Sequence, residues 1–310
     1  MASETQFSSP EDGTDRILRV GIIGCGEISQ VAHIPNINFL AHRFRTTYLC
    51  DISDKSLRHC AQKVLGGTPK TTSSAEELCS SPNVDVVIIA NADAYHVEHG
   101  LLALKNDKYC LIEKPASICF RDIDTLIEAE KTSRGKVFVG TMRRYATAFL
   151  DAVQEVGGME KNTLGTHDLS AMREIIGMPQ AVVGAILKLP GIFSVLFQYA
   201  GFPVTYESGL SGVPEFDAHI EVYSSEKIVK VEFDTPYIKG LPAIVTIREK
   251  VGNGYQERKI RKTYQDAYTL EMLEFYDCAV NGKTPKSSAE DARKDIELFE
   301  MIMKAGFKAT

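Results

Sequence analysis

Apolar runs and helical patterns alternate through the first half of the chain. The runs are rich in Val, Ile and Leu on both faces, as in buried parallel strands, and helical spacing follows each one. The predicted strands are Val20–Ile23, Thr46–Leu49, Val84–Ala90, Tyr109–Ile112 and Val137–Val139, and the predicted helices are Ile28–Ala41, Ser53–Leu65, His96–Asn106 and Arg121–Ser133. This alternation predicts a doubly wound parallel sheet.

The pattern changes after about residue 165, where runs alternate polar and apolar residues like antiparallel strands with one wet face. The predicted strands are Ala181–Leu189, Phe193–Tyr199, His219–Tyr223, Ile228–Phe233, Ala243–Glu249 and Tyr255–Tyr264, followed by helices Thr269–Val280 and Ala289–Ala305. We expect an α/β fold with a Rossmann domain in residues 17–145. An α+β domain with an open, mainly antiparallel sheet would occupy residues 146–310, and its last helices could pack back on the Rossmann domain. The polar residues 1–16 are expected to be a disordered extension.

The first predicted strand runs directly into Gly24-Cys25-Gly26. Gly24 permits a tight turn, and Gly26 has no Cβ, so a phosphate can approach the backbone at the start of the following helix. Ser29 replaces the third glycine of the usual G-x-G-x-x-G pattern, and it is small enough for close packing of helix on strand. This segment predicts a pyrophosphate site.

An acidic residue ends the second predicted strand. Asp51 follows Gly26 by 25 positions, close to the spacing in dinucleotide-binding folds. Its carboxylate would accept hydrogen bonds from the adenosine ribose and repel a 2′-phosphate. We therefore expect NAD as the cofactor, with NADP as the alternative because Lys55 lies nearby.

Composition excludes several other classes of protein. The net charge of −6 and the lack of basic runs argue against a nucleic-acid partner, and no apolar stretch is long enough to span a membrane. The seven cysteines form no C-x-x-C pair, which is typical of reduced thiols in a cytoplasmic protein. The histidines lack convergent ligand spacing, so we expect no metal site.

Two later strands end in residues that can carry chemistry. Val86–Ala90 is followed by Asn91 and, four residues on, by Tyr95-His96, while the next strand ends in Glu113-Lys114-Pro115. Ligands of open α/β sheets bind outside these carboxyl ends. Lys114 would therefore lie near the nicotinamide, where a cation can bind a substrate hydroxyl, stabilise an alkoxide and share in proton transfer.

These motifs, together with Met142-Arg143-Arg144-Tyr145, resemble the Gfo/Idh/MocA oxidoreductase family, most closely its fungal-type members. The likeness covers nearly the whole chain after residue 17. It continues through the segments 165–177 and 266–271, which contain His167 and Tyr268.

The resemblance implies a role for each matching residue. Lys114 matches the catalytic lysine, His167 the histidine that handles the substrate proton, and Pro115 follows a peptide bond that is often cis. Asp168 is a further catalytic candidate beside His167. The residues expected at the cofactor are Gly24, Cys25, Gly26, Glu27, Ile28, Asp51, Ala90, Asn91, Tyr95, His96, Glu113, Lys114 and Arg143, and those expected at the substrate are Arg144, Tyr145 and Tyr268.

Two departures from the family pattern concern the substrate side. Thr163 stands where many sugar-oxidising members have an aspartate, and Ser170 stands where another aspartate is common. Only 21 residues, Ala146 to Thr166, separate Tyr145 from His167. This segment predicts the end of a helix and a glycine turn with no strand, and hence a shortened substrate domain with a wide, wet pocket.

Three functions remain open at this point. The first is an NAD(P)-dependent oxidoreductase acting on a secondary alcohol or carbonyl of a sugar, polyol or secondary metabolite. The second is a redox-neutral enzyme that uses Lys114 and His167 for elimination, isomerisation or C–C cleavage, and the third is a non-catalytic dinucleotide-binding sensor. We also expect a homodimer formed through the open sheet, with exposed apolar residues at Val229, Val231, Phe233, Val245 and Ile247.

Overall fold

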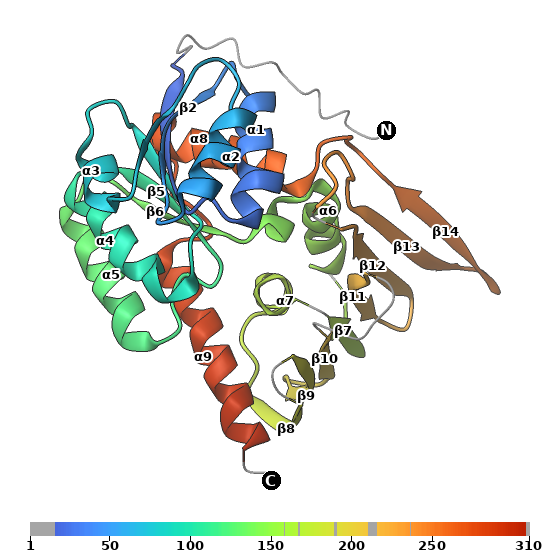
Figure 1. Cartoon of the computed structure of the whole chain (residues 1–310). Coiled ribbons are helices and arrows are strands. Elements are labelled where there is room, and N and C mark those ends of the chain that lie inside the picture. Colours follow the sequence, from blue (N-terminus) through green and yellow to red (C-terminus); the bar gives the residue numbers. More distant parts are fainter. Residues whose placement is uncertain are drawn as a thin grey trace.

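The computed structural model describes residues 16–157, 159–166, 168–188, 191–209, 216–235 and 237–307. The expected N-terminal extension lies outside these residues except for Arg16, and His167 also lies outside them. Two sheets organise the described chain (Figure 1). One is the parallel sheet expected of the Rossmann domain, and the other is a mixed, mainly antiparallel sheet.

The parallel sheet has the strand order β3-β2-β1-β4-β5-β6, which is the order of a dinucleotide-binding Rossmann fold. Its strands are β1 (Leu18–Ile23), β2 (Phe44–Cys50), β3 (Lys70–Thr72), β4 (Val86–Ile89), β5 (Tyr109–Glu113) and β6 (Val137–Gly140). The helical segments of this part are η1 (Ser29–His33), α1 (Ile34–Phe39), α2 (Asp54–Lys63), α3 (Ala75–Ser80), η2 (Asp93–Tyr95), α4 (His96–Lys105), α5 (Phe120–Thr132) and η3 (Met142–Tyr145).

Both faces of this sheet are covered, which explains why its strands are apolar on both sides. One core joins the sheet to α1, α2 and α8 (Ala267–Asn281), and the other joins it to α3, α4, α5 and the start of α9 (Ala289–Gly306). Two helices from the end of the chain therefore complete the N-terminal domain.

The helix after β1 is locally wide. Residues Ser29–His33 form a π-helical turn before α1, and Pro35 lies at the start of α1. Proline has no N–H, so it cannot continue the regular hydrogen-bond ladder, and the backbone relaxes into a wider turn. Pro35 thus coincides with a widened turn in a helix that continues.

The second sheet has the order β14-β13-β12-β11-β7-β10-β9-β8. Its strands are β7 (Thr163–Thr166), β8 (Ala181–Lys188), β9 (Ile192–Gln198), β10 (Pro203–Gly209), β11 (Ala218–Tyr223), β12 (Lys227–Phe233), β13 (Ile244–Val251) and β14 (Gly254–Ile260). Helices α6 (Thr147–Val156) and α7 (Leu169–Ile176) complete this part, and α6 packs against β12 and β13 (Figure 1).

The expectation that residues 146–166 contain no strand is wrong. Strand β7 lies in the middle of the second sheet, parallel to β10 and antiparallel to β11. Leu164 is fully buried and anchors β7 in the core, while the rest of the segment forms α6 and a turn, as predicted. The short connection between Tyr145 and His167 therefore has short loops around β7, but the strand itself is present.

The predicted apolar surface of this sheet also lies on the opposite face. Val229, Val231, Phe233, Val245 and Ile247 are all buried in the core that includes α6. Exposed apolar side chains of the outer face come instead from β8 and β9, where Ile186, Ile192 and Leu196 are 75%, 43% and 38% exposed. The alternation of polar and apolar residues predicts that the sheet has two different faces. Which face is covered depends on where α6 packs.

Candidate active site

The glycine turn after β1 has the geometry that a dinucleotide-binding loop needs. Gly24 has φ +97°, and a Cβ placed there would lie 2.5 Å from the backbone nitrogen of Asn91, so only glycine fits. The Ser29 hydroxyl donates a hydrogen bond of 2.6 Å to the Gly24 carbonyl oxygen. Ser29 is buried, and it therefore fills the third glycine position and stabilises the turn at the same time.

The residues around this turn fit a nicotinamide dinucleotide. A Cβ at Gly26 would meet no atom within 4 Å, which leaves the room that a phosphate requires. Glu27 beside it is exposed and Ile28 is half-buried. Across the turn, Oδ1 of Asn91 is buried and has no hydrogen-bond partner in the described structure. An open backbone and an unused buried acceptor are both features of a site that binds a polar ligand.

Asp51 lies beside the glycine turn, as its spacing predicts. Its Oδ2 accepts a 2.7 Å hydrogen bond from the Cys25 N–H, and its Oδ1 accepts one of 2.7 Å from the Ser53 N–H. Ser53 in turn caps α2 through the backbone N–H of Ser56. These bonds fix the carboxylate at the end of β2, next to the loop that would hold the pyrophosphate.

His96 connects the loops that follow β4 and β5. Its ring nitrogens lie 2.8 Å from the Pro115 carbonyl oxygen and 3.1 Å from that of Asn91. The ring is buried, so His96 is part of the framework of the site. Ala90 donates its N–H to the Ile23 carbonyl oxygen, while Tyr95 is half-exposed and stacks on His99.

Glu113 and Lys114 stand at the carboxyl end of β5 and point to different environments. Glu113 is buried; its Oε1 lies 2.9 Å from Nε2 of His33, and its Oε2 accepts the Lys114 N–H at 3.2 Å. Lys114 is exposed, and the Lys114–Pro115 peptide bond is cis. A buried carboxylate thus holds the backbone of a lysine whose side chain is open to a ligand.

An ion pair joins Arg143 of η3 to Asp168 of the second domain. Nη1 of Arg143 lies 3.1 Å from Oδ2 of Asp168, and its guanidinium lies over the rings of Phe233 and Phe216 at 5.4 and 5.9 Å. Oδ1 of Asp168 accepts the Ala171 N–H and caps α7. Asp168 therefore orders the start of α7 directly after the position of His167.

Arg144 and Tyr145 are buried, and their contacts are internal. The Arg144 guanidinium binds the carboxylates of Glu174 and Asp291, and the Tyr145 hydroxyl lies 2.6 Å from that of Ser287. Burial raises the pKa of Tyr145, so its hydroxyl stays protonated. These environments do not support the expected contacts of either residue with a substrate, and they favour a structural role.

Tyr268 lies at the start of α8 with its ring edge toward His33, 6.0 Å between centroids. Burial, followed by the nearby carboxyl groups of Glu113 and Glu271, raises its pKa. Sequence reasoning missed three side chains in this neighbourhood, namely His33, Glu271 and Tyr206. Tyr206 lies on β10, where the charges of Asp168 and Arg143 act on it. An acidic residue within the apolar pattern of α8 was the one available signal for Glu271.

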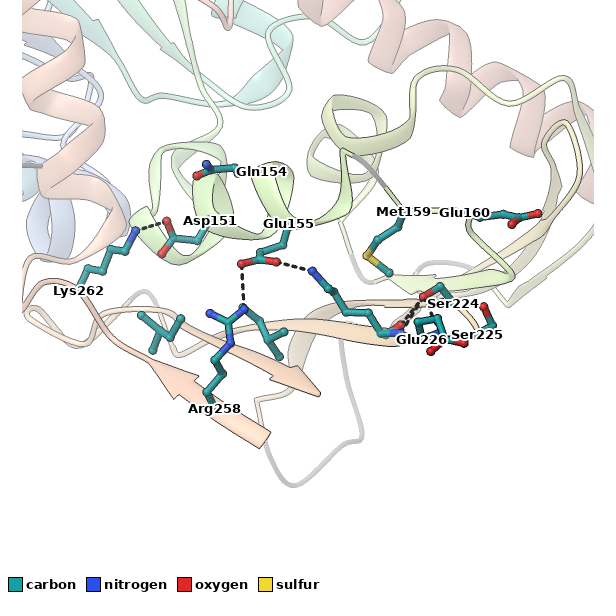
Figure 2. Close-up of a pocket in the computed structure, with 13 residues that line it drawn as sticks. Asp151, Gln154, Glu155, Met159, Glu160, Ser224, Ser225, Glu226, Arg258 and Lys262 are labelled. Carbon is teal, nitrogen blue, oxygen red and sulfur yellow. Dashed lines mark hydrogen bonds and ion pairs between the residues drawn. The ribbon is translucent and has the colours of Figure 1, made fainter. Parts of the chain in front are cut away.

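A pocket of about 790 Å³ lies elsewhere, between α6 and strands β12 and β14 (Figure 2). It contains none of the predicted site residues. Several of its charged side chains pair with one another: Asp151 with Lys262 at 2.5 Å, and Glu155 with Lys227 and Arg258. Among the described residues, no group of three or more potential ligands could hold a metal ion, and no described helix is long and apolar enough to cross a membrane.

The sequence and the fold of this chain are similar to those of known oxidoreductases. Residues 18–141 match the oxidoreductase family with an NAD-binding Rossmann fold, Gfo/Idh/MocA. Myo-inositol 2-dehydrogenase of Thermotoga maritima is 23% identical over 91% of this chain and 94% of its own length. Inositol 2-dehydrogenase of Acidiphilium cryptum is 33% identical over 44% of this chain and 41% of its own length. Among solved structures, a 3-ketoreductase from Actinomadura kijaniata in complex with NADP and TDP-benzene superposes with a TM-score of 0.81, at 15% identity, over 94% of this chain and 98% of that one.

The strand order and the glycine turn after β1 are those of a dinucleotide-binding Rossmann domain. Residues 18–141, which form the dinucleotide-binding part of the chain, are thus similar to the Gfo/Idh/MocA oxidoreductase family. The expected resemblance to this family, the fold class and the cofactor class, NAD(P), are confirmed.

Proposed function

We propose that this protein is a dehydrogenase or reductase that transfers a hydride between NAD(P) and a secondary alcohol or carbonyl carbon of a sugar, polyol or secondary metabolite. The observation that carries the proposal is the position of Lys114. It is exposed at the carboxyl end of β5, while Glu113 holds its backbone. The named activities of the inositol dehydrogenases support the same class of substrate.

Each residue of the site would have its own role in the reaction. The bound nicotinamide accepts or donates the hydride. Lys114 binds the substrate oxygen and stabilises its negative charge, and it exchanges a proton with that oxygen together with His167. Asp168 holds the first turn of α7 and Arg143, so its carboxylate orders the site from the side of the second domain. Ala90, Asn91, Tyr95 and His96 would line the cofactor.

We propose NAD as the preferred cofactor. The carboxylate of Asp51 stands beside the Cys25 N–H, where it would meet the adenosine ribose and repel a 2′-phosphate. NADP remains the alternative, since the 3-ketoreductase of similar fold was crystallised with NADP. Calorimetric titration with NADH and NADPH tests the preference, and tighter NADPH binding would overturn it.

Two observations favour the redox-neutral alternative. Asp168 is engaged in capping α7 and in pairing with Arg143, and Thr163 occupies the position where many family members have an aspartate. The experiment that separates the alternatives follows reduced-cofactor absorbance and product mass together, for polyols, sugars and their keto forms. Product with a stoichiometric change in cofactor supports the oxidoreductase. Product without it supports elimination, isomerisation or C–C cleavage.

We further propose a cytoplasmic homodimer that binds a small-molecule substrate and associates through the outer face of the second sheet. The exposed Ile186, Ile192 and Leu196 on adjacent strands support this assembly, because water disfavours clustered apolar side chains. We place the boundary between the two domains at residues 145 and 146, where η3 ends and α6 follows.

A further inference from the structure

Glu271 is a fully buried carboxyl group that the mechanism above does not use. It lies in α8 with 0% exposure, and neither of its oxygens has a hydrogen-bond partner in the described structure. An ionised carboxylate in such a place would be very costly, because nothing replaces the water it loses. Burial, and then the negative charge of Glu113, raise the pKa of Glu271 well above its usual range.

Glu271 belongs to a buried cluster that includes Glu113, the residue before Lys114. Tyr268 precedes it by three residues on α8, so both side chains lie on one face of that helix. The Tyr268 ring meets the edge of His33, and His33 in turn binds Glu113. From η3, Tyr145 is the other titratable group on which Glu271 acts. Acidic groups thus approach Glu271 from β5, η3 and its own helix.

The hydrogen bonds around Glu113 assign the single negative charge of this cluster. Glu113 accepts the Lys114 backbone N–H at Oε2 and faces Nε2 of His33 at Oε1, where the imidazole ring can donate its proton to an ionised carboxylate. Nδ1 of His33 is buried and has no partner in the described structure. Glu271, in contrast, receives no N–H bond that could stabilise its charge.

We propose that Glu271 is a positioning residue: it is an uncharged acid that, by keeping its proton, leaves Glu113 as the sole carboxylate supporting Lys114. The pair Glu113–Glu271 then holds one proton and one negative charge, since two neighbouring buried carboxyls cannot both ionise. One negative charge beneath the nicotinamide favours its cationic, oxidised form. This last consequence rests on the proposed function, whereas the protonation of Glu271 does not.

The stability of the protein without cofactor tests the protonation directly. A carboxyl group that keeps its proton only when folded makes the folded state lose stability as pH rises above the unfolded-state pKa, about 4.3. Glu271→Gln is neutral at every pH. Its melting temperature should therefore exceed that of the wild type, and the difference should widen steadily from pH 5 to pH 8.5.

Two comparisons make this test specific. Glu274→Gln changes a partly exposed residue on the same helix that pairs with Lys283, and no widening difference is expected there. When Glu113 is also replaced by Gln, the melting-temperature difference caused by Glu271→Gln should increase less with pH, because the neighbouring negative charge is gone. The proposal would be overturned by a melting-temperature difference that does not depend on pH, or by a Glu271→Gln protein that is less stable than the wild type at pH 8.5. It would also be overturned if the pH-dependent widening were the same in the Glu113→Gln background.

Cofactor titration tests the assigned location of the charge. Glu113→Gln should weaken NAD⁺ binding relative to NADH binding several-fold at pH 7. Glu271→Gln should change the ratio of the two affinities less than twofold. An equal shift in both variants would place the charge on Glu271 and contradict the assignment. If the wild type binds neither cofactor, the proposed function fails, yet the melting experiment still decides the protonation of Glu271.

Discussion

Arg143 of η3 and Asp168 at the start of α7 form an ion pair of 3.1 Å between Nη1 and Oδ2, which joins the two domains beside the proposed site. The same aspartate caps α7 by accepting the Ala171 N–H at 2.8 Å. One side chain therefore orders a helix start and an interdomain contact at once, immediately after His167 in the sequence.

The two tasks of Asp168 can be separated by mutation. Asp168→Ala should lose about 1 kcal/mol of stability through the missing cap, and turnover should fall as well. Asp168→Ser retains a capping oxygen but cannot pair with Arg143, so it should recover the stability and leave turnover low. Urea unfolding and steady-state kinetics measure the two effects. Full turnover in Asp168→Ser would show that the ion pair is unimportant.

Lys114 should act on turnover more than on binding. Lys114→Ala should leave cofactor affinity within a few-fold, yet lower turnover by on the order of 10² or more, because charge stabilisation and proton transfer act in the transition state. Lys114→Arg keeps the charge but not the ready proton, and should recover only part of the rate. Cofactor titration and initial rates check this expectation. Unchanged turnover in Lys114→Ala would exclude a catalytic role.

Gly24 should tolerate no side chain. In Gly24→Ala, the new Cβ would meet the Asn91 backbone at 2.5 Å in addition to adopting φ +97°. Gly66→Ala is the matched control, since Gly66 has φ +80° but a Cβ added there would meet no atom within 4 Å. The control should lose about 1 kcal/mol from backbone strain alone. Gly24→Ala should lose more and should also lose NAD binding; equal losses would argue against the close approach.

The buried ion network that holds α7 to α9 should be important for stability. Asp291 binds both Arg144 and Arg173, each side chain of which is 5% exposed. Asp291→Asn leaves these guanidinium groups poorly compensated and should cost about 3–5 kcal/mol. Asp124→Asn, which breaks a solvent-exposed pair with Arg293, should cost less than about 1 kcal/mol. Similar losses in the two variants, measured by urea unfolding, would contradict this ranking.

The same network has a defined pH dependence. Burial raises the pKa of Asp291, but its bonds to Arg173 and Arg144 outweigh burial and hold the pKa below its usual value. Its stabilising contribution is therefore complete above the unfolded-state pKa, about 3.9, and is lost as pH falls through the lower folded-state value. The stability difference between wild type and Asp291→Asn should narrow below about pH 4. A constant difference down to pH 2 would contradict this assignment.

The outer face of the second sheet should mediate a homodimer. Ile186→Lys together with Leu196→Lys places charges on the exposed apolar patch of β8 and β9, so it should convert dimer to monomer without unfolding the chain. Val183→Lys is the comparison variant. Val183 is another exposed residue of β8, and it lies where the pairing register between β8 and β9 shifts. Light scattering at micromolar concentration checks the mass, and a wild-type monomer would refute the proposal.

The Rossmann domain could be predicted because its main strands are apolar on both faces and end in glycine or polar motifs. β3 was missed because Lys70–Thr72 is short and not buried, so no apolar pattern marks it. β10 begins with Pro203 and ends with Gly209, which are both typical of loops. β7 carries only Leu164 as a buried apolar anchor, and its place between β10 and β11 is set by tertiary pairing.

The site could be predicted only where local motifs carry it. Gly24, Asp51 and Lys114 lie at strand ends that the sequence marks, and the structure has them there. The contact between His33 and Glu113 joins residues 80 positions apart, and no periodicity relates them. Whether an arginine pairs inside the protein or faces a ligand is likewise a tertiary property, which is why Arg144 was expected at the substrate.

The most direct test of the account follows reduced-nicotinamide absorbance and product mass while the purified protein reacts with NAD⁺ and polyols, or with NADH and the corresponding ketones. The account predicts one reduced or oxidised cofactor per product molecule, at a rate that falls about 10²-fold or more in Lys114→Ala. Product that forms without any change in the cofactor, or at the same rate in Lys114→Ala, would contradict it.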